Sequence, residues 1–462
     1  MRLALAAVLA CVNADNATNP LPKAAALLEA ATKLRAEAAA LETQAQAEAG
    51  ALESARVEQQ KAAAAATLAT TPPPVNTSEP TPAPTTPAPT PWSARPFRTR
   101  REDSRTTCST TVDQCRAAFP DLLRRIDWDL APWRLNGGIT PNQTRLRYDE
   151  AVGNGDQLAI SVRGGRAHVQ RWGRGYKSRT VTAHNMITQS LARVCGVPEV
   201  SKFVYTTSDH APPPDMKQAG KAPLGIWCRR TDDPYSIAAP EGSFLVNGDN
   251  GNVGNKVNAT AHALEMARHA PPWKNRTDKL WFRGQIWRGG GNDARRAVAQ
   301  FLRGNHPDGN PWAEVLDIAE GGVGAHDQCT HKYLLYLHGS ACSGRLKNLL
   351  RCGSLVVFPR SAGGVYNAPD KHGRGYGQGI VYEEFFYHRL VLENETVVRP
   401  DQLVDLLPFV KILRRYDDAS RRIGEAARAR AMRELSVEAA MCYWAVLLAE
   451  VGELQRIGGF AF

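Results

Sequence analysis

The chain has 462 residues, of which 43% are hydrophobic and 22% are charged. This composition is typical of globular proteins, and the length is sufficient for two or three domains with proper cores. A small disulfide scaffold is excluded, and no apolar run approaches the roughly 20 residues of a membrane helix, which argues against an integral membrane protein.

Positive charge is concentrated in the later part of the chain. Lys and Arg number 57 against 46 Asp and Glu, a formal net charge of +11, although residues 15–94 carry five basic and eight acidic side chains. The excess therefore belongs to the region after residue 94, which predicts an anionic partner. Nucleic acid, anionic lipid and a nucleotide diphosphate all satisfy this condition.

The first residues have the pattern of a secretory leader. Arg2 precedes an apolar run to Val12, and the small residue Ala14 follows. Residues 1–14 are therefore predicted to be a signal peptide, with a plain N-terminal helix as the alternative. Glycosylation sequons begin at Asn16, Asn76, Asn142, Asn258, Asn275 and Asn394. With the eight cysteines after the leader, they favour the lumen of the secretory pathway, and ER, Golgi and secretion stay open.

Two low-complexity segments follow the leader. Residues 15–70 are Ala-rich, and Ala24, Ala31 and Ala38 recur every seven residues, which predicts a helical stalk. Alanine buries little area, so a single solvated helix and a weak stalk-mediated oligomer both stay open. Residues 71–94 are rich in Pro and Thr and predict an extended linker.

From residue 95, short β-rich runs alternate with helical runs. The predicted strands are 158–162, 201–207, 225–228, 244–247, 280–284, 314–318, 333–338 and 354–359. The predicted helices are 112–126, 183–194, 259–269, 293–302, 345–352, 408–416, 418–435 and 436–454.

This alternation is typical of parallel sheets covered by helices, and the region is too long for one open sheet. We expect an α/β fold with two Rossmann-like, doubly wound domains facing a cleft. Their predicted limits are 95–270 and 271–435, and a final helix at 436–462 crosses back to the first domain.

A Gly-rich turn at residues 289–291 lies between a predicted strand and a predicted helix. Its glycines let backbone amides approach a ligand, and the helix start adds partial positive charge. Arg283, Arg288 and Arg295 add whole charges. The pattern is that of an anion site, although it lacks the Lys-Ser/Thr of a P-loop, and a structural loop is the alternative.

A second turn of small residues, 339–344, follows the strand predicted at 333–338 and opens a helix that carries Arg345 and Lys347. Such a turn suits a diphosphate at the C-terminal edge of a parallel sheet. The aromatic and acidic segment Val381–Tyr387 comes later, and its composition is explained most simply by core packing.

In their order these segments resemble the Rumi-type protein O-glucosyltransferases and the related capsule-associated glycosyltransferases, glycosyltransferase family 90. The matching residues are Trp273-Lys274, Phe282-Arg283-Gly284, Lys332 to Arg345, Cys352 to Val356 and Glu384 to Tyr387, with Asp129 to Trp133 as an opening motif and Cys442-Tyr443-Trp444 in the closing helix. The resemblance implies a GT-B fold whose C-terminal domain holds UDP-glucose or UDP-xylose. It also implies inverting transfer, without a metal, to a hydroxyl of a protein serine or a glycan.

The expected donor-binding residues are Gln285, Arg288, Arg295, Ser340, Ala341, Cys342, Ser343, Gly344 and Arg345. All but Arg288, which belongs to the Gly-rich turn, are implied by the resemblance. The resemblance also implies Asp209 as the general base, which takes the proton of the attacking hydroxyl while positive groups meet the charge on the leaving UDP. His210 is a rival base, and a turn-forming role is the structural alternative for Asp209. Asp127 and Asp129 imitate a metal-binding Asp-x-Asp pair but lie in the opening motif.

The disulfides implied by the resemblance are Cys329 with Cys352, and Cys442 with Cys115 or Cys108. Cys195, Cys228 and Cys342 are left unassigned, and Cys342 is expected to be a small buried thiol.

Two segments depart from the family pattern. Residues 361–380 form an insertion that is either a lid over the donor or a solvated loop. Residues 241–256 replace a Trp-rich stretch on the acceptor side, so the acceptor is not identified. The alternative function is that of a non-catalytic protein of the same fold that binds a glycan or a UDP-sugar. A nucleic-acid-binding protein is disfavoured because the sequence has no recognisable motif for nucleic-acid recognition.

Overall fold

The computed structural model describes residues 108–152, 156–172, 177–208, 220–231, 233–245, 259–284, 314–321, 327–338, 342–359, 382–390, 395–398 and 406–462. All of them belong to one unit of the chain, Ser93–Phe462. The predicted signal peptide, stalk, linker and insertion lie outside the described residues, as does the helix predicted at 293–302.

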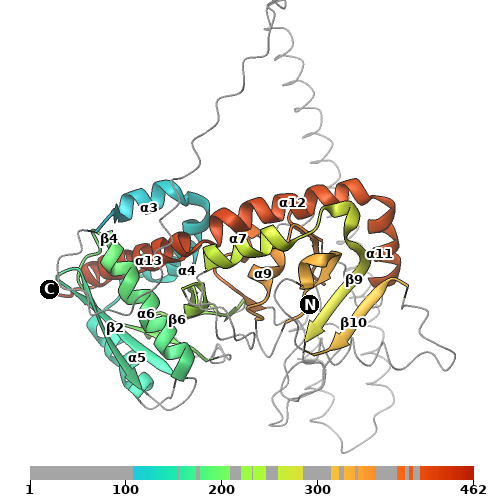
Figure 1. Cartoon of the computed structure of the whole chain (residues 1–462). Helices are drawn as coiled ribbons and strands as arrows, with labels where there is room; N and C mark the ends of the chain where they lie inside the picture. Colours follow the sequence, from blue (N-terminus) through green and yellow to red (C-terminus); the bar gives the residue numbers. More distant parts are fainter. Residues whose placement is uncertain are drawn as a thin grey trace, which may run out of the picture. The chain divides into compact units, whose positions relative to one another are not determined.

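The first sheet has the strand order β3-β2-β5-β6-β8, and its strands β2 and β6 are labelled in Figure 1. Its strands are β2 (Gln157–Arg163), β3 (Arg166–Trp172), β5 (Val200–Thr206), β6 (Leu224–Ile226) and β8 (Ser236–Ala238). β5, β6 and β8 are parallel, but β2 runs antiparallel to β3 and to β5. The expectation of a purely doubly wound sheet is therefore wrong here. Gly164 and Gly165 both have positive φ, which is the geometry of a tight hairpin, and this hairpin adds the antiparallel strand β3.

Helices α5 (Pro141–Val152) and α6 (Lys177–Arg193) pack against this sheet. The single helix predicted at 112–126 is two helices, α3 (Val112–Ala118) and α4 (Pro120–Leu135), because Pro120 has no amide hydrogen to continue α3 and starts a new helix. The strand predicted at 244–247 is also wrong in its described part. Gly242–Phe244 is a short 3-10 helix, η1, and a Cβ at Gly242 would lie 2.5 Å from the Ala183 amide nitrogen of α6.

The second sheet is parallel throughout, as predicted, with the order β10-β9-β11-β12-β14. Its strands are β9 (Thr277–Gly284), β10 (Leu316–Glu320), β11 (His331–Leu335), β12 (Leu355–Val357) and β14 (Val397–Val398). Tyr333, Leu334 and Leu335 are all buried, since helices cover parallel sheets on both faces and leave no solvated side. Helices α9 (Leu346–Arg351), α11 (Leu406–Arg415) and α12 (Asp417–Glu434) contact this sheet.

The remaining elements are short, apart from α7 (Ala259–His269), whose bounds are those predicted. They are β1 (Thr110–Thr111) paired with β4 (Val194–Cys195), β7 (Arg229–Arg230) paired with β13 (Tyr382–Glu383), α10 (Tyr387–Leu390), η2 (Trp273–Asn275) and η3 (Asp327–Thr330).

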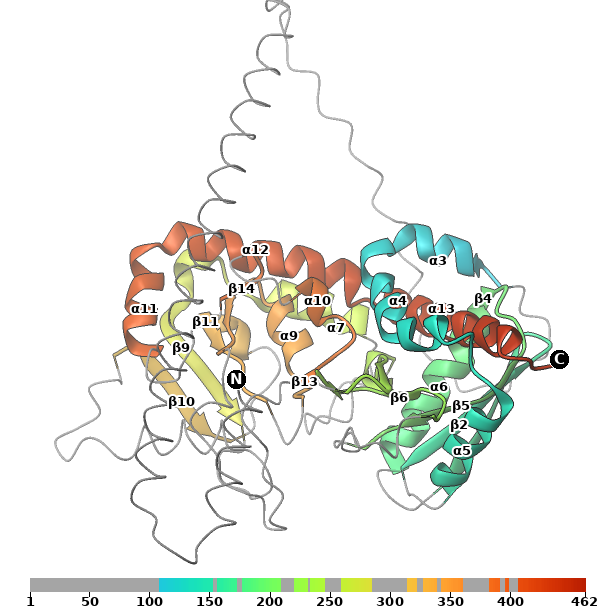
Figure 2. The same ribbon diagram turned by 180° about the vertical axis from the view of Figure 1, so that it is seen from behind.

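The last helix, α13 (Val437–Ile457), leaves α12 at a bend of 55° and lies against α3, α6 and β5 (Figure 2). Its Tyr443 hydroxyl donates to the Ala238 carbonyl at 2.9 Å, and its Trp444 indole donates to the Pro240 carbonyl at 3.0 Å. Among the described residues no single helix has the length and apolar composition of a membrane span; only the bent pair α12 and α13 meets that test jointly.

The eight cysteines that follow the predicted leader are all paired. The disulfides are Cys108–Cys195, Cys115–Cys442, Cys228–Cys342 and Cys329–Cys352. The structure thus confirms the pairing of Cys329 and selects Cys115 as the partner of Cys442. The expectation of a free thiol at Cys342 is wrong, because the fold brings the end of β6 to the turn that contains this residue.

Candidate active site

The carboxyl end of β9 is the centre of the candidate site. Phe282, Arg283 and Gly284 end this strand in the middle of the parallel sheet, where ligands of such sheets bind. Gln285, Arg288 and Arg295 follow directly in the chain but lie outside the described residues.

Arg345 reaches this strand end from the turn after β11. Its Nη1 donates to the Arg283 carbonyl, and its guanidinium lies 5.2 Å from the centre of the Phe282 ring. A Cβ on Gly284 would stand 3.3 Å from both Nη atoms of Arg345, which is a tight contact. The glycine therefore makes room for the guanidinium. The structure therefore brings the Phe-Arg-Gly motif and the predicted donor arginine together, although they are 61 positions apart along the printed sequence.

The charge of Arg283 has a partner within the sheet. Its Nη1 donates to the Asp317 carbonyl at 2.7 Å, and its Nη2 lies 2.5 Å from the Asp317 carboxylate on β10. His331 also contacts that carboxylate, at 3.1 Å. Burial lowers the pKa of His331, although Asp317 opposes this shift. Arg283 thus ties neighbouring strands together, which is a different task from the anion binding expected of it.

The turn that carries Arg345 is held by an aromatic side chain of the core. The Ser343 amide donates to the Tyr336 hydroxyl at 3.0 Å, and that hydroxyl lies 2.7 Å from the Tyr387 hydroxyl. Tyr387 belongs to the aromatic segment 381–387, whose described members Phe385 and Phe386 are buried core residues, as predicted. Tyr336 and Tyr387 therefore fix the backbone of the turn, a role that composition did not indicate. Ser340 and Ala341 of the same turn lie outside the described residues.

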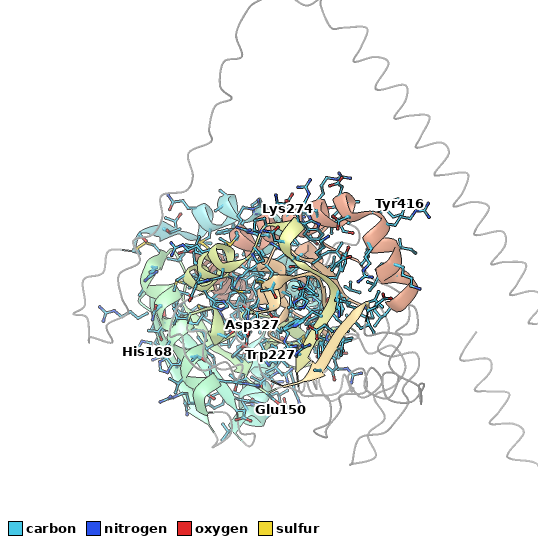
Figure 3. All side chains as sticks on the ribbon, turned by 45° about the vertical axis from the view of Figure 1, so that its right-hand side comes forward. Glu150, His168, Trp227, Lys274, Asp327 and Tyr416 are labelled. Atoms are coloured by element: carbon cyan, nitrogen blue, oxygen red, sulfur yellow. A yellow bond between two sulfur atoms is a disulfide. The ribbon has the colours of Figure 1, made fainter. Side chains whose placement is uncertain are left out.

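The disulfide Cys228–Cys342 anchors the residue of this turn that precedes Ser343. Cys228 follows Trp227, whose indole nitrogen donates to the Ser208 carbonyl at 3.0 Å (Trp227 is labelled in Figure 3). Ser208 immediately precedes Asp209, the predicted base, which lies outside the described residues together with His210. One covalent bond and one hydrogen bond thus connect the turn of Arg345 to the residue before Asp209.

A small cavity of about 10 Å³, enough for one water molecule, lies beside the end of β5. Arg179, Tyr205, Thr207, Trp227 and Glu241 are among the residues that line it. The Arg179 guanidinium lies 5.8 Å from the centre of the Trp227 ring. Positive charge is therefore present at this strand end, next to the segment that contains Asp209.

A buried charged group lies between η1 and α9. The Lys347 ammonium, with a side chain only 1% exposed, contacts the Glu241 carboxylate at 2.5 Å. Burial alone would raise the pKa of Glu241, but Lys347 and Ser243 outweigh it and hold this pKa below the ordinary value. The ammonium of Lys347 is therefore neutralised by the Glu241 carboxylate. Its position on α9, directly after the Arg345 turn, does not make it a diphosphate ligand.

Glu384 lies close to the same group and is 1% exposed. Burial, and then the charge of Glu241, raise its pKa well above the ordinary value, against the opposing effect of Lys347. Glu384 therefore retains its proton, and stays a neutral acid, to a higher pH than an exposed carboxyl group does.

Asp127 and Asp129 do not form a metal-binding pair. Asp127 contacts Arg134 at 3.0 Å, whereas the buried Asp129 contacts Arg125 at 2.8 Å and Arg229 at 2.6 Å. Two guanidinium groups occupy the oxygen that a metal would need. In the part of the chain that the structure describes, no three His, Cys, Asp or Glu residues are grouped to hold a metal ion.

Comparisons with known proteins place the chain in a family. The model of the family "Glycosyl transferase family 90" matches residues 113–362, more than half of the chain. Protein O-glucosyltransferase 1 of Homo sapiens is 25% identical over 190 residues, which cover 39% of this chain and 43% of that protein. O-glucosyltransferase rumi of Drosophila pseudoobscura pseudoobscura is 26% identical over 203 residues, which cover 40% of this chain and 43% of that protein. The chain thus matches less than half the length of these relatives.

One solved structure, a glycosyltransferase from Rickettsia africae ESF-5, matches with a TM-score of 0.27 and 9% identity over 59% of this chain and 82% of that chain. The family match covers the opening helices, the first sheet, β9, the Arg345 turn and β12 in one continuous segment, and on that ground the chain belongs to glycosyl transferase family 90.

Proposed function

We propose that this protein is an inverting glycosyltransferase that moves glucose or xylose from a UDP-sugar to a hydroxyl of a protein serine or a glycan. The observation that carries the proposal is the position of Arg345 against the carboxyl end of β9, in a chain that belongs to family 90. The names of the relatives, protein O-glucosyltransferases, support the choice of a sugar donor and a hydroxyl acceptor. The four disulfides support a site of action in the secretory pathway.

The proposed architecture is of the GT-B type. The second sheet, within residues 271–435, would bind the donor, and the first sheet, within residues 95–270, would present the acceptor. Residues 436–462 would belong with the first sheet, because α13 contacts β5 and α6. The disulfide Cys228–Cys342 supports the proposal that the donor and acceptor sites are neighbours. It joins the segment after β6 of the first sheet to the turn that carries Arg345.

Arg345 and the amides of residues 340–344 would bind the pyrophosphate of UDP, together with Gln285, Arg288 and Arg295 from the loop after β9. Together these groups would stabilise the negative charge that grows on UDP as the sugar leaves. Their number of positive charges makes a metal ion unnecessary for that step.

Asp209 would act as the general base. It follows Ser208, whose carbonyl accepts a hydrogen bond from the Trp227 indole. A carboxylate there accepts the proton of the acceptor hydroxyl as the hydroxyl oxygen attacks the anomeric carbon and the bond to UDP breaks. Direct attack by the acceptor inverts the configuration of that carbon.

The test compares Asp209→Asn with His210→Asn. UDP binding is measured by calorimetry, and turnover is measured by mass spectrometry with UDP-glucose and UDP-xylose. We expect Asp209→Asn to bind UDP like the natural protein but to lose turnover, while His210→Asn retains both. Loss of turnover in His210→Asn alone would move the base to His210. UDP binding without turnover of any UDP-sugar would identify a non-catalytic binding protein, and no UDP binding at all would reject the donor site.

A further inference from the structure

A cavity of about 420 Å³ lies among α4, β7 and β13. Its lining includes Trp128 and Pro132 of α4, Pro234, Thr231, Arg229 and Glu383. Its volume lies within the range of small-molecule sites, about 300 to 1,000 Å³. Its described lining includes no residue of the Arg345 turn or of the β5 end, although Arg229 follows Cys228, the disulfide partner of that turn.

The floor of the cavity is a closed network of four charges. Arg125 and Arg229 both contact Asp129, and the Arg229 Nε lies 2.9 Å from the Glu383 Oε1. Arg125 also contacts that Oε1, and the Ala238 amide donates to the second oxygen of Asp129 at 3.1 Å. Two positive and two negative groups balance, so the floor is polar, rigid and without net charge. Such a surface favours a neutral polar ligand over a phosphate or a cation.

Hydrogen-bonding capacity remains on the lining side chains. Both arginines meet Glu383 at Oε1, and within the described residues no group donates a hydrogen bond to Oε2. Arg229 donates hydrogen bonds through Nη1 to Asp129 and to the Ser236 carbonyl. Its Nε lies 2.9 Å from Glu383 without forming a hydrogen bond among the described residues, and the hydrogens of Nη2 are also left over. A carboxylate oxygen beside a guanidinium nitrogen matches two neighbouring hydroxyls, one donating and one accepting.

The wall of the cavity is apolar and aromatic. Trp128 is 54% exposed, a large value for this side chain, and an edge contact with the His388 ring at 5.3 Å fixes its orientation. Pro132 and Pro234 add rigid apolar surface without flexible side chains. A ligand that fills this site must therefore offer both an apolar face and several hydroxyl groups.

We propose that this cavity binds a neutral saccharide, with a hexose or pentose ring stacked on Trp128 and its hydroxyls bonded to Glu383 and Arg229. A pyranose ring has this double character, since its C–H groups form an apolar face and its hydroxyls point outward. The proposal does not require transfer activity. If the proposed function also holds, the bound sugar is part of a glycan on the acceptor.

The test is ligand-observed NMR on the full chain with methyl glycosides of glucose, xylose and N-acetylglucosamine, in excess UDP to fill the donor site. We expect at least one glycoside to bind and Trp128→Ala to weaken its affinity roughly tenfold or more. The control is Tyr416→Ala, which removes an aromatic side chain that is 59% exposed at the start of α12 and does not line this cavity. It should leave binding unchanged.

Thr231→Val is a second variant that tests the polar contacts without disturbing the buried charges, and it should weaken binding to a smaller degree. The pocket is rejected if none of the three glycosides binds at millimolar concentration, or if Trp128→Ala binds as tightly as Tyr416→Ala. UDP affinity and UDP-sugar turnover are measured on the same samples. Glycoside binding without UDP binding rejects the proposed function and keeps the pocket, and the reverse result rejects only the pocket.

Discussion

Cys228 and Cys342 are joined by a disulfide across 114 positions of the chain, and this bond connects the end of β6 to the turn of Arg345. The Cys342 amide also donates to the Cys228 sulfur at 2.8 Å. Next to this bond, the Tyr336 hydroxyl accepts the Ser343 amide. Two consecutive residues of the turn, Cys342 and Ser343, are therefore held before any ligand binds, which lowers the ordering cost of binding.

Removing this disulfide should loosen the turn. For Cys228→Ala with Cys342→Ala we expect a weaker affinity for UDP, in addition to a loss of about 2 to 5 kcal/mol in the free energy of unfolding. Calorimetry with UDP and denaturant unfolding measure the two effects separately.

The pair Cys108→Ala with Cys195→Ala is the matched control, because its sequence separation of 87 gives a comparable chain-entropy loss. That disulfide joins the start of the described chain to β4, so UDP affinity should not change. Equal UDP affinities in both double variants would show that the Cys228–Cys342 bond serves stability alone.

Arg345→Ala should weaken UDP binding roughly 10- to 150-fold, because a charge-assisted contact to a phosphate contributes about 1.5 to 3 kcal/mol. The control Arg421→Ala removes an exposed guanidinium on α12 that contacts Glu425 at 2.9 Å. Calorimetry on both variants checks the assignment. An unchanged dissociation constant for Arg345→Ala contradicts it.

Gly284→Ala should have a similar but smaller effect. The added methyl would lie 3.2 Å from the Phe282 ring and 3.3 Å from the Arg345 Nη atoms, so the guanidinium must move by a few tenths of an ångström. We expect UDP affinity to fall while the melting temperature changes little, because the displaced group is the end of a flexible side chain. The control is Gly137→Ala, because a Cβ at Gly137 would meet no atom within 4 Å. Alanine is strained there by the positive φ of 78°, but it does not contact Arg345. Gly137→Ala should therefore lower the melting temperature and keep UDP affinity, the opposite of Gly284→Ala.

Local pattern predicted most of the fold. The helix 259–269 and the parallel strands around Leu280, Tyr333 and Val356 follow from periodicity and apolar runs, which depend on neighbours in the chain. The hairpin strand β3 was missed because Arg166, His168 and Gln170 give it a polar face. The motifs also predicted that Arg345 lies near the carboxyl edge of the sheet.

Contacts between segments that are distant in the chain cannot be predicted from local sequence pattern. The pairing of Cys228 with Cys342 depends on how the chain folds, and cysteine spacing leaves many connectivities open. The position of Lys347, two residues after Arg345, predicts a diphosphate contact, but its buried ammonium forms an ion pair with Glu241 instead. A side chain's partner is decided by tertiary packing, which one sequence does not reveal.

Glu384 should make stability depend on pH in a direction that is unusual for a carboxyl group. Burial, followed by Glu241, raises its pKa above the ordinary 4.5, so the folded chain retains a proton that the unfolded chain has lost. Its contribution to stability is therefore complete below about pH 4.5 and is lost as the pH rises through the raised pKa. Glu384→Gln cannot ionise and should flatten the decline of the unfolding free energy above pH 4.5. Denaturant unfolding at a series of pH values measures this slope.

Glu241→Gln tests the same buried group with the opposite sign. Its carboxylate has a lowered pKa, so the stability it contributes is present above the ordinary value of 4.5 and disappears as the pH falls through the lowered pKa. The amide would also leave the Lys347 ammonium buried without a negative partner, at a cost of about 3 to 5 kcal/mol. Glu241→Gln should thus destabilise the protein near neutral pH, whereas Glu384→Gln stabilises it or leaves it unchanged. If both substitutions cost the same free energy at neutral pH, Glu384 is ionised in the folded protein and its assignment as a neutral acid is wrong.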